Sequence, residues 1–331
     1  MTFILDFAEI GKEDVERCGG KGANLGELAR AGIRVPPGFS IVADALPYVL
    51  EAASLTEEIA GIAAGLDFDD PNAVEAETAR IRSLIAAAPV PVDLETEIVD
   101  AYRALSGDGE TFVAVRSSVA IADSDISSFP GMMDTYHYVL GERDVLERIR
   151  ECWASLWTAR AAFARHAQGF AHERGLISPV VQVMIDADTA GVLFTANPVS
   201  RKTTEMVVEA NWGIGESVVS GVARTDFFTL DKTTLTVAER RIGQKTMMIT
   251  VDREHGSGRT EREVPPELQT QATLSEAQLI ELAAAGMKIQ QHFGFEADVE
   301  WAYSDGVLYI LQARRIRTLE PGQLETSTKG A

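Results

Sequence analysis

The chain has 331 residues, with 30 Lys plus Arg against 50 Asp plus Glu and a formal net charge of −20. This charge argues against non-specific nucleic-acid binding, which depends on Lys and Arg to displace counterions, and against docking on an anionic membrane surface. At roughly 150 residues per domain, the length predicts about two domains or lobes.

Two cysteines, Cys18 and Cys152, are too few for a disulfide framework or a cysteine-based metal site. A reduced compartment is the simplest interpretation. The N-terminal residues lack a basic region before an unbroken apolar run, so no signal peptide is expected. No window approaches the roughly 18 apolar residues of a membrane span. We therefore expect a cytoplasmic protein.

The first part of the sequence predicts strands separated by helices. Strands are expected at 3–7 and 39–42, with a helix at about 22–31 between them. From about 43 to 105, Ala, Leu and Ile recur at helical spacing, which predicts a set of short helices.

Half of the net charge lies in residues 51–100, which carry twelve acids and two bases. The short helices here are expected to break at 69–71 and 89–91, where prolines occur. An amphipathic scaffold with a solvated acidic face is the simpler interpretation, and an acidic docking face is the alternative. An anionic ligand is therefore expected to bind elsewhere.

Further along, strands are predicted at 112–115 and 135–140, on either side of a Ser/Asp/Gly-rich segment at 117–131. A long helix is expected at about 144–170, and its two tryptophans are interpreted as core residues.

The second half changes to short β-branched runs separated by turns. A helix at about 275–293 opens with a capping box formed by Ser275 and Gln278. A hairpin is predicted from 297–303 and 307–313. The β-branched runs before this helix predict five strands, at 180–185, 191–195, 206–210, 227–230 and 235–240.

Strands alternating with helices, followed by a mostly antiparallel half, predict an α+β fold of two lobes that can close on a ligand. The first lobe is expected at 1–185, including the helical acidic segment at about 43–105. The second lobe is expected at 186–316, with the closing hairpin. Residues 317–331 are interpreted as a linker or disordered tail.

A Gly-rich segment, Gly19-Gly20-Lys21-Gly22, precedes the first predicted helix. Glycines let a backbone approach a phosphate closely, the helix start offers unpaired N–H groups, and Lys21 adds a positive charge. The spacing is not that of a P-loop. Taken alone, the segment is equally consistent with an ordinary turn.

Arg116 stands in Val115-Arg116-Ser117-Ser118, at the predicted end of a strand, where a rigid guanidinium can grip phosphate oxygens. The Ser/Gly-rich run that follows, through Gly131 to Thr135, is flexible enough to form a lid. The alternative is an ordinary surface loop with Arg116 in an ion pair.

The segment Val181-Gln182-Val183-Met184 is followed by a second extended run at 191–198. An extended backbone can pair with an adenine edge while Val and Met line an apolar slot for the ring. By itself this pattern is also that of a buried strand with a turn. A later G-x-G, within 212–217, is uninformative alone.

The closing hairpin carries Glu300 on one strand and Gln312 and Arg314 on the other. A carboxylate and an amide oxygen suit Mg²⁺ on a nucleotide, and Arg314 would balance the phosphates. A two-residue Asp305-Gly306 turn places Glu300 on the face opposite to Gln312, whereas a three-residue loop gathers all three side chains on one face. The metal hypothesis therefore requires the three-residue loop.

Seven motifs occur in the order found in a known family: GGKGANLGEL, VRSS, SSFPGMMDTY, VQVMI, GVLFTANP, NWGIGES and ADVEWAY with LYILQARR. Over about residues 10–316 the chain resembles the ATP-binding domain of the phosphoenolpyruvate synthase, pyruvate phosphate dikinase and rifampin phosphotransferase family. The resemblance implies an ATP-grasp-type nucleotide-binding fold of two lobes with ATP between them.

The same resemblance implies roles for individual residues. Lys21, Arg116 and Arg314 become the catalytic phosphate contacts, and Glu300 and Gln312 become the Mg²⁺ ligands. Glu209 and Lys245 are secondary candidates for the nucleotide site. The other residues expected to bind ATP are Gly131 and Thr135, in the loop over the phosphates, and Gln182, Val183 and Met184, beside the adenine.

In this family ATP loads a histidine on a separate swivelling domain, within a Ser-His or Thr-Ser-His segment. None of the five histidines stands in such a segment: His137, His166, His172, His255 and His292. The resemblance therefore implies an ATP-binding subunit or domain that binds Mg-ATP, phosphorylates a histidine on a partner chain or missing domain, and gives AMP and phosphate overall. An acceptor-binding subunit is expected as a further partner.

Three alternatives stay open at this point. One is a non-catalytic, nucleotide-sensing regulatory subunit with the same fold. Another is a phenylphosphate synthase-type subunit with an aromatic acceptor. The third is a self-sufficient small-molecule kinase, which would need an acceptor pocket within the same two lobes.

Overall fold

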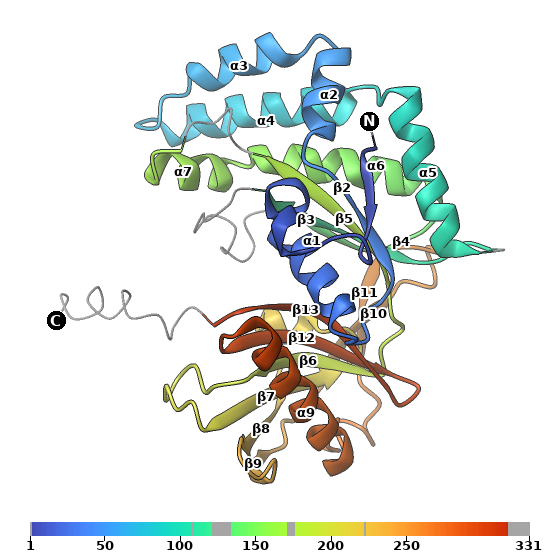
Figure 1. The fold of residues 1–331 in the computed structure, drawn as a ribbon, viewed down its shortest axis with the longest axis vertical. Coiled ribbons are helices and arrows are strands. Elements are labelled where there is room, and N and C mark those ends of the chain that lie inside the picture. The colour runs from blue at the N-terminus through green and yellow to red at the C-terminus, as the bar shows by residue number, and fades with distance from the viewer. Residues whose placement is uncertain (1, 108, 121–133, 171–175, 222, 317–331) are drawn as a thin grey trace. The chain divides into compact units, whose positions relative to one another are not determined.

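The computed structural model describes residues 2–107, 109–120, 134–170, 176–221 and 223–316. The chain separates into two compact units that are not continuous in sequence (Figure 1). The lobe boundaries given by the sequence pattern stay a prediction, and the tail predicted at 317–331 lies outside the described residues. Unit 1 consists of Met1–Glu27, Pro37–Met184 and Arg253–Gly258, and unit 2 of Leu28–Pro36, Ile185–Asp252 and Arg259–Ala331.

Unit 1 contains a five-stranded antiparallel sheet with the strand order β1-β2-β5-β3-β4. All seven residues of β3 are buried, in line with its position inside the sheet and the apolar start of its sequence. The strands are β1 (Ile4–Asp6), β2 (Gly38–Ile41), β3 (Val113–Val119), β4 (Thr135–Val139) and β5 (Ile177–Val183).

The helices of unit 1 follow the predicted pattern with one exception. The breaks expected at 69–71 and 89–91 are confirmed. The single helix expected at 144–170 is wrong, because Thr158 is extended and its side chain caps a new helix by accepting from the Ala161 N–H. The helices are α1 (Val15–Arg30), α2 (Ala45–Ala52), α3 (Thr56–Ala64), α4 (Pro71–Ala87), α5 (Val92–Ser106), α6 (Glu142–Ala154) and α7 (Ala159–Ala167), with short 3-10 turns at Lys12–Asp14 and Ser155–Trp157.

Helices cover both faces of the unit 1 sheet. α1 approaches the face that carries Ser118, where Gly19 lies against the Ser118 side chain. α6 packs on β3, β4 and β5, with the guanidinium of Arg148 over the ring of Tyr136. The twelve acids of residues 51–100 lie on α2 to α5 and their connections, and none of them is buried, so they belong to the exposed surface of these helices.

Unit 2 contains a six-stranded antiparallel sheet with the order β13-β12-β6-β7-β8-β9, and a separate two-stranded ribbon of β10 and β11. The predicted strands of this half are confirmed, and the ribbon, which pairs the mostly apolar β10 with the polar β11, is an addition. The strands are β6 (Thr189–Phe194), β7 (Glu205–Trp212), β8 (Asp226–Asp231), β9 (Val237–Arg241), β10 (Met247–Val251), β11 (Arg259–Glu263), β12 (Ala297–Ser304) and β13 (Val307–Arg315).

In the described part of unit 2, two helices accompany this sheet: α8 (Glu216–Val219) and α9 (Glu276–Phe293). The predicted capping box of α9 is confirmed, since the Ser275 Oγ accepts from the Gln278 N–H while the Gln278 side chain accepts from the Ser275 N–H. α9 packs on β6 and β12, and Gly286 allows the close approach because a side chain there would meet Leu193. None of the helices in the described ranges is long and apolar enough to span a membrane.

Candidate functional site

Lys21 lies at a break in α1. Gly19 has a left-handed φ of 65° with a ψ of 172°, which interrupts the helix and starts it again with the next residues. The backbone N–H of Lys21 donates to Ser118 Oγ at 3.0 Å, and Lys21 Nζ donates to the Ser117 carbonyl oxygen at 2.5 Å. The expected Gly-rich turn before a helix is therefore present, and β3 holds the lysine beside it.

Arg116 lies within β3 and not at its end, which corrects the sequence expectation. β3 continues to Val119, in register with β5 along its whole length. The side chain is held in place, because Arg116 is only 9% exposed and its Nη1 donates to Gln182 Oε1 at 3.0 Å. Arg116 itself therefore does not lie in a surface loop, and the run at 121–133 that the same alternative covered lies outside the described residues.

Gln182 carries a buried hydrogen-bond donor that is not used within the described part of the chain. The side chain is 3% exposed, and its Nε2 has no hydrogen-bond partner among the described residues. A buried donor left unpaired costs about 1–3 kcal/mol. An acceptor atom of a ligand at this position would therefore be stabilising.

Val183 and Met184 are fixed by backbone hydrogen bonds within unit 1. The Val183 N–H donates to the Pro37 carbonyl at 2.9 Å, and the Met184 N–H donates to the Phe112 carbonyl at 2.8 Å. Both N–H groups are thus already used in this structure. Any contact of these two residues with an adenine ring would therefore involve their carbonyl oxygens and side chains.

Thr135 begins β4 directly opposite Arg116 in the strand register. Its side chain is exposed. The pairing of β3 with β4 shifts in register between Val113 and Val115, and Thr135 lies opposite Arg116 beyond that shift. Tyr138 of β4 has a left-handed φ of 55°, which is rare for an aromatic residue. Gly131, the other residue expected over the phosphates, lies outside the described residues.

The closing hairpin joins its strands by a two-residue turn, so the expected three-residue loop is wrong. Asp305 and Gly306 have φ angles of 49° and 75°, as a type I′ turn requires. A β-bulge between the turn and the proposed ligands then adds one residue, Leu311, on β13. The pairing changes by one position, and Glu300 lies opposite Gln312 on the same face of the sheet.

The next pair along the same face is Asp298 with Arg314. They are register partners, and the carboxylate accepts from Arg314 Nε at 2.9 Å and lies 2.8 Å from Nη2. Burial raises the pKa of Asp298, the Arg314 charge opposes this shift, and the Glu300 charge adds to it. Sequence reasoning missed Asp298, although its spacing of two from Glu300 on a strand was a usable signal.

Glu209 and Lys245 differ in position. Glu209 points to the same side of the unit 2 sheet as Glu300, because Val192 is the register partner of both. Lys245 is fully buried and forms an ion pair with the equally buried Asp226 at 2.7 Å. Its ammonium is thus used for the fold, and the structure does not bring it to the face of Glu300.

The NWGIGES motif builds a junction inside unit 2. Gly213 has a φ of 72°, and a Cβ there would lie 2.3 Å from the Ile249 carbonyl oxygen. The Asn211 Nδ2 donates to Ser217 Oγ and to the Met247 carbonyl oxygen, both at 3.0 Å. These contacts attach the start of β10 to the end of β7, which gives the motif a structural role.

The described histidines lie in ordinary structural positions. His137 is in β4, His166 stacks on Phe68 at the end of α7, His255 is in the turn between β10 and β11, and His292 is in the last turn of α9. His172 lies outside the described residues. The described residues contain no group of three His, Cys, Asp or Glu side chains suited to a metal ion.

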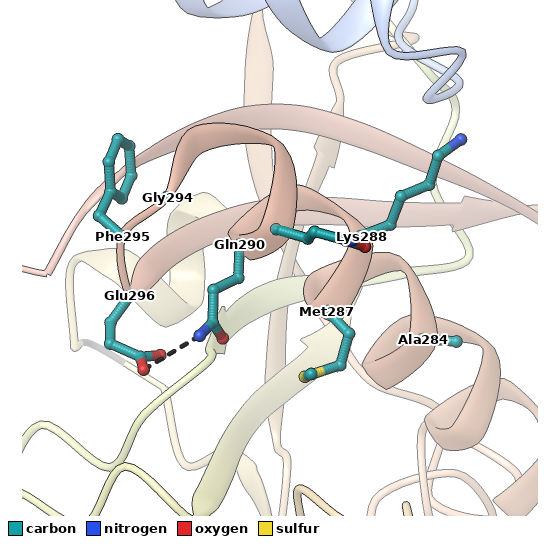
Figure 2. A pocket seen from close by; sticks show the side chains of 8 residues that line it. Ala284, Met287, Lys288, Gln290, Gly294, Phe295 and Glu296 are labelled. Atoms are coloured by element: carbon teal, nitrogen blue, oxygen red, sulfur yellow. Dashed lines mark hydrogen bonds between the residues drawn. The ribbon is translucent and has the colours of Figure 1, made fainter.

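A pocket of about 700 Å³ lies along α9 in unit 2 (Figure 2). Within it, Gln290 Nε2 donates to Glu296 Oε1 at 3.1 Å. α9 packs against Leu193, whose register partner Val299 points away from the face of Glu300. The pocket therefore does not contain the predicted ATP residues. Its lining consists of Ala284, Met287, Lys288, Gln290, Gln291, Gly294, Phe295 and Glu296.

Comparison with known proteins agrees with the motif order. Residues 15–330 match the model of the pyruvate phosphate dikinase AMP/ATP-binding domain. The chain is 41% identical to a probable phosphoenolpyruvate synthase of Methanothermobacter thermautotrophicus, over 99% of this chain and 48% of the relative. It is 35% identical to a rifampicin phosphotransferase of Bacillus cereus, over 97% of this chain and 36% of the relative.

The chain spans less than half the length of these curated relatives. The match nevertheless covers nearly all of the chain, and the resemblance drawn from the seven motifs is confirmed. This chain belongs to the pyruvate phosphate dikinase AMP/ATP-binding domain family.

Proposed function

We propose that this chain is the ATP-binding part of a dikinase-type phosphotransferase. It binds Mg-ATP and phosphorylates a histidine on a separate domain or partner chain. The family supports ATP as the ligand, and the names of the relatives, phosphoenolpyruvate synthase and rifampicin phosphotransferase, support phosphoryl transfer. Because the chain spans less than half of those relatives, the later steps are assigned to other domains or subunits.

The observation that carries the proposal is the register of the β12–β13 hairpin. Glu300 and Gln312 are strand partners on one face of the sheet, and a carboxylate and an amide oxygen are ligand types that Mg²⁺ accepts. Asp298 and Arg314 follow on the same face. Mg²⁺ bound there would supply neutralisation of the phosphate charge, and Arg314 would bind phosphate oxygens beside it.

Unit 1 offers the complementary groups. Lys21 and Arg116 are proposed to contact the phosphates, and both are held by β3. Thr135, opposite Arg116, is proposed to contact the phosphates together with Gly131. Gln182 is proposed to donate through its buried Nε2, and the carbonyls and side chains of Val183 and Met184 are proposed to border the adenine.

Phosphoryl transfer needs little covalent help from a protein, because positioning and charge neutralisation supply most of the rate. The proposed overall reaction converts ATP, water and an acceptor into AMP, phosphate and a phosphorylated acceptor. The β-phosphoryl group travels by way of the partner histidine. An acceptor-binding subunit would complete the enzyme.

Transfer of label to a histidine tests this function. The chain is incubated with Mg²⁺ and ATP labelled at the β-phosphate, with and without the histidine-bearing domain encoded with it. We expect an acid-labile, base-stable protein label only when both are present. Rapid multiple-turnover AMP formation by the chain alone would contradict the proposal that the phosphorylated histidine lies on another domain or chain. Tight ATP binding without any transfer to the partner would favour a nucleotide-sensing subunit.

A further inference from the structure

The restarted part of α1 lacks a capping side chain of its own. After the break at Gly19, the first N–H groups of the new helical segment have no carbonyl four residues earlier to bond with. A residue before such a start commonly accepts from the second or third N–H through its side chain. Glycine has no side chain to do so.

Ser118 of β3 supplies the missing acceptor from a distant part of the chain. Its Oγ accepts the N–H of Lys21, the second residue after the break, at 3.0 Å. Ser118 is fully buried. A Cβ on Gly19 would lie 2.2 Å from the same Oγ, so the glycine leaves the space that this hydroxyl fills.

The same strand carries Arg116. Arg116 and Ser118 are two residues apart on β3, so both side chains point to one face of the sheet. Lys21 Nζ also donates to the Ser117 carbonyl, which lies between them in the sequence. The positions of the two proposed phosphate cations of unit 1 are thus set by three consecutive residues of one strand.

We infer that Ser118 is a positioning residue for ATP binding, which acts by fixing the backbone of Lys21 relative to Arg116. The inference rests on the proposed function, since it gives Ser118 a role only if Lys21 contacts the nucleotide. Ser118 is the second serine of the VRSS motif, and its hydrogen bond to Lys21 joins that motif to the Gly-rich segment.

The test compares two buried serines of the same sheet. Ser178 is the register partner of Ser118, is fully buried, and its Oγ has no hydrogen-bond partner among the described residues. Calorimetric titration with Mg-ATP is expected to give about five- to tenfold weaker binding for Ser118→Ala, the loss of one hydrogen bond. Ser178→Ala should stay within about twofold of the wild type.

A double-mutant cycle separates positioning from general loosening of the fold. If Ser118 acts through Lys21, Ser118→Ala should weaken binding less than about twofold in a Lys21→Met background, and should keep its full effect in a Gln312→Leu background. Equal effects in both backgrounds, or equal effects of Ser118→Ala and Ser178→Ala, would overturn the inference. Should Ser118→Ala fail to fold, Ser118→Cys fills the space with a slightly larger thiol, replaces the hydroxyl with a poor acceptor, and carries the same expectations.

Failure of this inference is distinguishable from failure of the proposed function. If the wild type does not bind Mg-ATP, the proposed function is wrong. If the wild type binds and Lys21→Met weakens binding while Ser118→Ala does not, only the role of Ser118 is wrong.

Discussion

Glu300 lies directly opposite Gln312, although the hairpin between them turns in only two residues. A regular hairpin with that turn would place the two side chains on opposite faces of the sheet. The bulge at Leu311 corrects the alternation, so that a carboxylate and an amide oxygen share one face. The proposed metal ligands therefore depend on a local irregularity of β13.

Gln312→Leu tests the proposed role of the amide in metal-dependent binding. We expect at least about tenfold weaker binding of Mg-ATP and little change in the binding of ATP in EDTA, because only the metal-mediated contact is removed. Calorimetric titration under both conditions measures this. Gln290→Leu is the matched control, since Gln290 lies beside the α9 pocket of the same unit. An equal loss with and without Mg²⁺ would argue against a metal ligand.

Two neighbouring glycines of α1 are predicted to respond in opposite ways to alanine. Gly19→Ala forces a left-handed residue and a Cβ 2.2 Å from Ser118 Oγ, and should lower the free energy of unfolding by at least about 1–2 kcal/mol. Gly20 has no atom within 4 Å of its Cβ position, so Gly20→Ala should be neutral or stabilising by up to about 1 kcal/mol. Urea denaturation of both variants measures the free energy of unfolding. A Gly19→Ala variant as stable as the wild type would contradict the break of α1 at Gly19.

The buried ion pair of Lys245 and Asp226 predicts a large effect on stability. Lys245→Met leaves a fully buried carboxylate without its cation and should lower the free energy of unfolding by about 3–5 kcal/mol. Lys202→Met removes a cation from an exposed ion pair with Glu205 and should change the free energy of unfolding by less than about 1 kcal/mol. Denaturant unfolding measures both. A mild effect of Lys245→Met would contradict the assignment of this ammonium to the fold.

Asp298 predicts a pH dependence of stability. Burial holds its pKa above the ordinary value of 3.8, so the folded state binds this proton more tightly than the unfolded state does. The contribution of this group to stability is greatest below the ordinary pKa and falls as pH rises through the raised pKa. The unfolding free energy of the wild type should therefore fall relative to Asp298→Asn as the pH rises above about 4. A difference that stays constant or moves the other way would contradict the raised pKa.

Local features of this fold could be predicted from the sequence. The capping box of Ser275 with Gln278, the breaks near Pro71 and Pro89, and the strands of the closing hairpin all depend on neighbouring residues. The order of the seven motifs was not needed to predict these elements, because capping, proline geometry and alternation act over a few residues.

Register and side-chain pairing could not be predicted in the same way. The extension of β3 past Arg116 depends on pairing with β5, about 65 residues further along the chain. The ion pair of Asp298 with Arg314 and the position of Gln312 depend on a bulge that no turn residue announces. The burial of Lys245 depends on Asp226, which sequence reasoning had no means to pair with it.

Binding of Mg-ATP is the most direct test of the central claim. Calorimetric titration of the wild type should show saturable binding, and Arg116→Ala and Glu300→Ala should each abolish it, because one removes a proposed phosphate contact and the other a proposed metal ligand. Arg143→Ala and Glu239→Ala, at exposed positions outside the proposed site, should bind as the wild type does. Unchanged binding in both Arg116→Ala and Glu300→Ala would contradict the account.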